Sequence, residues 1–165
     1  MAQDNHKDSY EDGMKVRRRV LGDAWVDRSL ANRNDFNAEI GRQITSHVWG
    51  DIWTRPAIDL KTRRFMTLSI MIALRAWAEF RLHVRSGLAT GDLTKDELKE
   101  IIMQATAYCG APAGNHATHE AEEAFKEIAK YDKEEQVGNN RRDRSKKPRV
   151  LRHRDPALGV VPGRA

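Results

Sequence analysis

The chain has 165 residues, of which 39% are hydrophobic and 32% are charged, and its formal net charge is +5. This length and composition suit one soluble domain with a single core. The positive charge is concentrated in residues 137–165, which hold nine Lys and Arg against two Asp and Glu. A basic tail can bind nucleic acid by counterion release, but such tails are more often simply solvated, so we expect no nucleic-acid partner.

A single cysteine, Cys109, excludes an intrachain disulfide and any CxxC motif. The first ten residues are polar and lack the apolar centre of a signal peptide. The longest apolar run, residues 65–74, contains Thr67 and Ser69 and is too short to span a bilayer. We therefore expect a cytoplasmic protein without a membrane segment.

Six helices are predicted, and no stretch keeps the period of two that is typical of a strand. The first spans residues 9–20, after a disordered segment at 1–8, and Gly22 follows it. The second starts near Asp35 and ends at Gly50, with apolar residues one turn apart facing the core. These predicted core residues are Phe36, Ile40, Ile44 and Val48. Trp49 and Trp53 are predicted to pack as lids in the loop that follows, although tryptophans in a loop can also wall a pocket.

The third helix, residues 60–75, is apolar on almost every side, which is typical of a buried helix. One small bundle offers too little cover for such a helix, so we expect a homo-oligomer. The fourth helix, residues 77–89, carries a core stripe that includes Phe80 and Val84.

Thr94 and Glu97 form a capping box that starts the fifth helix, whose apolar face ends at Cys109. Gly110 and Pro112 separate it from a sixth helix over residues 112–131 with an alanine-rich face. The sequence thus predicts an all-α domain over residues 9–136 and a basic, flexible tail over 137–165.

Glu79 and His83 lie one helical turn apart, so their side chains can meet. A carboxylate beside an imidazole can orient it and form a proton relay. Most such pairs are ordinary surface pairs, but this one borders a core stripe. Arg55 and Arg63 flank the third helix and are either solvated or a clamp for carboxylates.

Cys109 is predicted to be an inert, packed thiol, unless His119 stabilises its thiolate. His116 and His119 are three residues apart, a spacing that matches no zinc signature, so we expect no metal. A histidine near a helix N-terminus tends to lose its proton, which favours a neutral, hydrogen-bonding His119.

The chain resembles the 4-carboxymuconolactone decarboxylase family of the alkylhydroperoxidase D-like superfamily over residues 10–130. Four segments carry the resemblance: GMKVRRRVLGDAWVDRSL (13–30), HVWGDIWTRP (47–56), EFRLHVRSG (79–87) and DELKEIIMQATAYCGAPAGNHATH (96–119). Redox members of the superfamily carry CxxC before a histidine. Here Ala76 and Glu79 occupy those positions, which excludes disulfide chemistry.

The resemblance implies an all-α trimer or hexamer that decarboxylates 4-carboxymuconolactone without a cofactor, giving 3-oxoadipate enol-lactone in protocatechuate catabolism. His83, oriented by Glu79, is expected to deliver the proton. The oxyanion is expected to be stabilised by Asn115 or His119, and the substrate to be held by Arg55, Arg63, Cys109 and Asn115. Trp77 and His116 are among the residues that depart from the family's pattern, and the bulkier Trp77 is expected to narrow or reshape the pocket.

Two alternatives stay open at this stage. One is a lyase or isomerase that acts on a related carboxylated lactone. The other is a non-catalytic helical oligomer whose basic tail binds an acidic partner.

Overall fold

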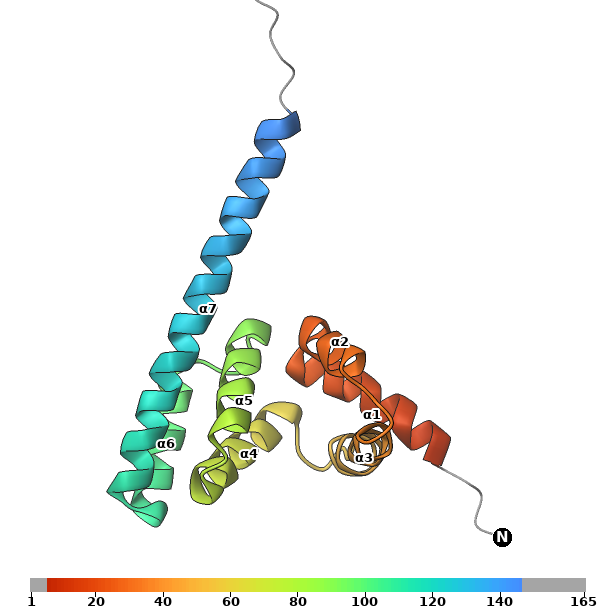
Figure 1. The fold of residues 1–165 in the computed structure, drawn as a ribbon. Helices are drawn as coiled ribbons and strands as arrows, with labels where there is room; N and C mark the ends of the chain where they lie inside the picture. The colour runs from red at the N-terminus through yellow and green to blue at the C-terminus, as the bar shows by residue number, and fades with distance from the viewer. Residues whose placement is uncertain (1–5, 147–165) are drawn as a thin grey trace, which may run out of the picture. The chain divides into compact units, whose positions relative to one another are not determined.

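The computed structural model describes residues 6–146, with side chains for residues 9–130, and the described part contains seven α-helices, one π-helix and no strand (Figure 1). The all-α prediction is confirmed. Residues 1–129 form one compact unit and residues 130–165 a second, of which the described residues 130–146 are helical. The elements are α1 (His6–Leu21), α2 (Asp23–Ala31), α3 (Ala38–Gln43), η1 (Ile44–Ile52), α4 (Leu60–Leu74), α5 (Trp77–Thr90), α6 (Lys95–Cys109) and α7 (Ala111–Lys146).

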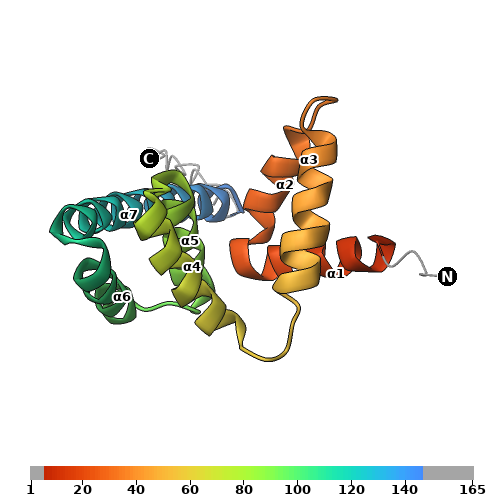
Figure 2. The same ribbon diagram turned by 90° about the horizontal axis from the view of Figure 1, so that it is seen from below.

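The π-helix η1 continues directly from α3 and packs against α1 (Figure 2). The crossing is close because both helices carry a glycine there. A Cβ on Gly13 would lie 2.3 Å from the Thr45 carbonyl oxygen, and a Cβ on Gly50 would lie 2.1 Å from the Ser9 carbonyl oxygen. Two main chains can approach this closely only where side chains are missing.

The predicted core stripe of the second helix is wrong. Its side chains are exposed, from 86% at Phe36 to 38% at Val48. The buried face of η1 instead consists of Thr45, Ser46, Trp49 and Gly50. Where η1 crosses α1 most closely, the main chains leave no room for a side chain at Gly50, and the apolar residues of the predicted stripe lie on the outward side.

Helix α4 is capped at its N-terminus by Asp59, whose carboxylate accepts a hydrogen bond from the Thr62 amide at 2.6 Å. It ends at Arg75, which adopts the left-handed conformation with φ of 55°. Only one side of α4 is buried, at Arg64, Leu68 and Ile72. The prediction that α4 is buried all round is wrong for the single chain, since Met66, Ile70 and Leu74 are exposed.

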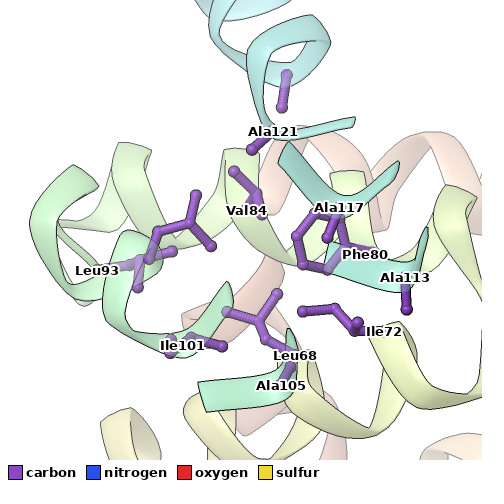
Figure 3. Close-up of a cluster of buried hydrophobic side chains, with 12 residues drawn as sticks. Leu68, Ile72, Phe80, Val84, Leu93, Ile101, Ala105, Ala113, Ala117 and Ala121 are labelled. Carbon is purple, nitrogen blue, oxygen red and sulfur yellow. The ribbon is translucent and has the colours of Figure 1, made fainter. Parts of the chain in front are cut away.

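The main core lies among α4, α5, α6 and the first part of α7 (Figure 3). Leu68 and Ile72 of α4, Phe80 of α5 and Ile101 of α6 converge there on alanines of α7 (Figure 3). The alanine face predicted for the last helix is buried at Ala113, Ala117, Ala121 and Ala124. The predicted capping box also forms, with Thr94 and Glu97 each accepting the other's backbone N–H.

Other differences concern element boundaries. Helix α2 has no counterpart among the predicted elements; it buries Val26 and joins Trp25 to the core cluster of α1 and η1. Helix α7 runs to Lys146, past the predicted helix end at residue 131 and the predicted start of the tail at 137. Most of the predicted disordered start and of the tail lies outside the described residues. None of the described helices is long and apolar enough to cross a membrane.

Candidate active site

His83 lies on the buried side of α5 and is 5% exposed. Its imidazole stacks on two indoles, with ring centroids 6.3 Å from Trp49 and 6.0 Å from Trp53. The two indoles also contact each other, with centroids 4.9 Å apart, so the three rings form a triangle. The Nδ1 atom of His83 is buried and has no hydrogen-bond partner within the described residues. Buried polar atoms are almost always paired, so this nitrogen is a candidate ligand contact.

Burial, together with the smaller effect of the nearby Arg64 guanidinium, lowers the pKa of His83 to about 4. Both effects disfavour the imidazolium, one through lost hydration and the other through like charge. At neutral pH the ring is therefore uncharged, with one nitrogen as donor and the other as acceptor.

Arg64 fixes the backbone around His83. Its guanidinium is 1% exposed and donates to the His83 carbonyl oxygen at 3.0 Å, to Ser86 Oγ at 2.8 Å and to the Val20 carbonyl oxygen at 2.8 Å. Asp92 lies 3.6 Å away as its counter-ion. Arg64 thereby ties α4 to α5 and α1 at the position of the imidazole.

A cleft of about 430 Å³ lies beside this cluster. Its lining includes Trp53, which stacks on His83, but not His83 itself. The charged residues of the lining are the basic Lys15 and Arg55 and the acidic Asp12 and Asp59. Its volume suits a small organic ligand. Arg63 is absent from the lining, but its guanidinium donates to the Arg55 carbonyl oxygen at 2.8 Å. Of the two predicted clamp residues, Arg55 therefore faces the cleft and Arg63 holds its loop.

The predicted contact between Glu79 and His83 is not made. Glu79 is exposed, and no hydrogen bond or ion pair joins it to another of the described residues. The two side chains leave α5 in different directions, since His83 faces the buried side, where η1 and Arg64 contact it. The helical spacing permits the contact, but burial of the imidazole draws it away from the carboxylate.

The remaining predicted residues lie at the end of α6 and the start of α7. Cys109, Asn115 and His119 are all exposed, so the prediction of a packed Cys109 thiol is wrong. The α6 apolar face ends one turn earlier, at Ala105, and leaves the terminal residue in solvent.

His116 stacks on Trp77, with ring centroids 4.3 Å apart and planes 10° from parallel. The Nε2 atom of His116 also lies 3.2 Å from a carboxylate oxygen of Glu120. The His119 ring packs edge to face against the His116 ring, with ring centroids 6.4 Å apart. Trp77 and His116, which both depart from the family's pattern, are thus in direct contact with each other.

No group of three or more His, Cys, Asp and Glu that could hold a metal occurs within the part of the chain that the structure describes.

Four residues of this site were not among the predicted site residues: Trp49 and Trp53 were expected as packing lids, with a pocket wall as the less favoured alternative, and Lys15 and Arg64 were not singled out. The sequence holds features that point to three of these four residues. Two tryptophans four residues apart beside Arg55 indicate an aromatic wall. An arginine within an apolar helix is a buried charge that requires partners.

Comparisons with known proteins converge on one group. Residues 38–123 match the Carboxymuconolactone decarboxylase family, and this range contains every predicted site residue. The chain is 43% identical to a 4-carboxymuconolactone decarboxylase of Acinetobacter baylyi over 124 residues, which cover 75% of this chain and 92% of that protein. It is 37% identical to a nitrosuccinic acid decarboxylase of Metarhizium robertsii over 108 residues, covering 66% of this chain and 75% of that protein. A 4-carboxymuconolactone decarboxylase of Pseudomonas putida is 55% identical over 47 residues, which are 28% of this chain and 98% of that protein.

Proposed function

Because the chain belongs to the carboxymuconolactone decarboxylase family and is a carboxy-lyase, we propose that it converts 4-carboxymuconolactone to 3-oxoadipate enol-lactone with loss of CO2. The observation that carries the proposal is the buried imidazole of His83, whose Nδ1 has no hydrogen-bond partner among the described residues and whose neighbour Trp53 lines a cleft together with Arg55. This step would serve the protocatechuate branch of aromatic catabolism. A chain with one cysteine suits the reducing cytoplasm, where we place the reaction.

The chemistry requires a sink for electrons and a source of one proton. When the C–CO2 bond breaks, its electron pair moves through the conjugated ring to the lactone carbonyl oxygen and forms a dienolate. A proton then adds to carbon and gives the enol-lactone. A hydrogen-bond donor at the carbonyl oxygen stabilises the charge that develops there.

The neutral state of His83 favours the first of these roles. A ring whose pKa is about 4 carries almost no extra proton at neutral pH, so it is a poor proton source. A neutral imidazole N–H in an apolar site is nevertheless a good donor to an oxyanion. We therefore assign oxyanion stabilisation to His83. Glu79 and His119, the other predicted proton-transfer residues, are exposed and absent from the cleft lining, so a part for either in proton delivery would require a neighbouring copy of the chain or a rearrangement.

Arg55 and Lys15 supply positive charge for the substrate's carboxylates. Both line the cleft, where Lys15 is already 2.7 Å from Asp12. The guanidinium of Arg55 presents a fork that can bind a carboxylate through two parallel hydrogen bonds. Asn115 and Cys109 lie on other elements, and their predicted substrate contacts would require a neighbouring copy of the chain or a rearrangement.

We also propose that the enzyme is a homo-oligomer. Large apolar side chains are exposed on two consecutive stretches, which together offer an unusually apolar surface for one chain. They are Phe36, Ile40, Ile44, Val48 and Ile52 before the cleft loop, and Met66, Ile70 and Leu74 on α4. Light scattering after gel filtration tests this: Ile44→Glu should lower the mass of the particle, and a monomeric wild type would contradict the proposal.

The decisive assay uses authentic 4-carboxymuconolactone and protein treated with a chelator. It measures the release of CO2 and the loss of the substrate's ultraviolet absorbance. His83→Phe keeps an aromatic ring beside the indoles but removes both nitrogens, and should lower kcat by about 10²–10³. Arg55→Ala should lower kcat/KM by about 10- to 100-fold through KM, because it removes a charge-assisted bond. Arg28→Ala, on the exposed side of α2, is the matched control. Full turnover by His83→Phe would rule out the assignment, and activity that depends on added zinc would point to a metal enzyme instead.

A substrate panel separates the alternatives. The relative named nitrosuccinic acid decarboxylase motivates including nitrosuccinate beside 4-carboxymuconolactone and its isomeric lactones. Preferred turnover of a different compound would keep the enzyme class and replace the substrate.

A further inference from the structure

The imidazole of His83 belongs to a cluster of three aromatic rings. Trp49 and Trp53 are 6% and 7% exposed, and they are the aromatic neighbours of the imidazole. Both come from η1 and the residue that follows it, so one short segment places both rings on the same side of His83. Helices of the π type are rare and occur frequently at functional sites.

The other neighbours of His83 complete its surroundings. The main-chain carbonyl of His83 accepts a bond from Arg64, the charged group of α4 that faces the ring. The segment η1 contributes uncharged indoles and no counter-ion at that position. The backbone of His83 is therefore held by a guanidinium and its ring by two indoles, while its Nδ1 has no hydrogen-bond partner in the part of the chain that the structure describes.

We propose that Trp49 and Trp53 are positioning residues for the reaction, which keep water from one side of the His83 imidazole and hold its plane so that its free nitrogen is reserved for the substrate. This inference rests on the proposed function only for the part that His83 plays in it. Trp53 has the further property that it lines the cleft, so a ligand there touches the same indole that touches the imidazole.

A fixed, dry imidazole has a measurable consequence. If the indoles keep water away, their removal should let water reach the ring and raise the pH at which His83 takes up a proton. Substitution by phenylalanine keeps a ring at each position and should preserve most of the effect. Trp25 is the matched control, because it packs against the same core cluster without stacking on His83.

The experiment uses the full chain with ¹³C-labelled histidine and follows the His83 ring by NMR across pH, with His83→Gln to assign the signal. In Trp49→Leu and Trp53→Leu the titration should move upward by about one pH unit or more. The midpoint of the His83 titration should move by only a few tenths of a pH unit in Trp49→Phe and Trp53→Phe, and should not move in Trp25→Leu. The pH at which kcat/KM falls on the acidic side of its pH profile should shift by the same amount as the His83 titration.

The proposal is overturned by a His83 titration that is unchanged in both leucine variants, or by one that shifts equally in Trp25→Leu. A shifted titration with an unchanged pH profile of turnover would also overturn the positioning role. The NMR titration needs no substrate, so it tests the aromatic cluster even if the wild type fails to release CO2 from the lactone, which would refute the proposed function instead.

A second measurement does not depend on the folding of a tryptophan variant. Hydrogen–deuterium exchange at the imidazole C2 position, read by mass spectrometry, reports water access to each histidine of the wild type. His83 should exchange at least several-fold more slowly than the exposed His47 and His119 at the same pH. Equal rates would contradict the exclusion of water.

Discussion

The crossing of α1 and η1 gives a sharp prediction, because Gly50 has no space for a side chain. A Cβ at this position would lie 2.1 Å from the Ser9 carbonyl oxygen and 2.5 Å from Ser9 Oγ. The first of these atoms belongs to the main chain of α1, which cannot move aside without shifting the helix. Gly50→Ala therefore forces α1 and η1 apart.

The magnitude follows from two opposing terms. Overpacking of a core usually costs about 1–3 kcal/mol, and a clash with main chain belongs at the upper end. Alanine is favoured over glycine within a helix by about 0.5–1 kcal/mol, which offsets part of this cost. We expect Gly50→Ala to lower the free energy of unfolding by about 2 kcal/mol.

Gly41→Ala is the matched control, because the nearest atom to its new Cβ would be Arg33 Nε at 3.5 Å, an ordinary contact. It lies in α3, immediately before η1, and should raise the free energy of unfolding by a few tenths to about 1 kcal/mol. Urea unfolding of the three proteins, followed by circular dichroism at one protein concentration, measures both effects. A Gly50→Ala protein as stable as the wild type would refute the close crossing.

Further predictions concern buried charge, protonation and the tail. The pKa of His83 is about 4 in the folded chain and near 6.5 in the unfolded chain, so the unfolded state binds more protons between these two pH values. Acidification from pH 6.5 to 4 should therefore lower the free energy of unfolding by about 3 kcal/mol. Urea titrations across pH check this, and in His83→Gln this part of the pH dependence should be missing. Arg64→Met leaves three hydrogen-bond acceptors without their donor and should destabilise the chain by about 3–5 kcal/mol. The control Arg28→Met should change the free energy of unfolding by less than about 0.5 kcal/mol. Equal midpoints of urea unfolding for the two variants would contradict this prediction. Deletion of residues 138–165 should leave kcat unchanged, and a large loss of turnover would give the tail a part in the reaction.

Much of the helical framework could be predicted from the sequence because its signals are local. The capping box at Thr94, the glycine after α1 and the alanine face of α7 depend on residues within a few positions of each other, and all three are confirmed. Helix α2 has only nine residues and buries one of them, which is too weak a periodic signal to predict it.

The orientation of the helices was harder to predict, because it depends on what each helix meets. The period of Phe36 to Val48 indicated a core face, but the contact with α1 at Gly13 and Gly50 selects the opposite face. Spacing alone paired Glu79 with His83, whereas two indoles brought from η1 bury the imidazole away from it. Such choices are made by tertiary contacts that no single segment encodes.

Arg75 has a practical consequence for engineering this enzyme. It closes α4 with φ of 55°, a conformation that costs a residue with a Cβ about 1 kcal/mol and costs glycine almost nothing. The side chain is exposed, and the position is separate from the cleft lining. Exchanging this one arginine for glycine or asparagine should therefore yield a biocatalyst with a longer working life in a warm reactor and an unaltered choice of substrate.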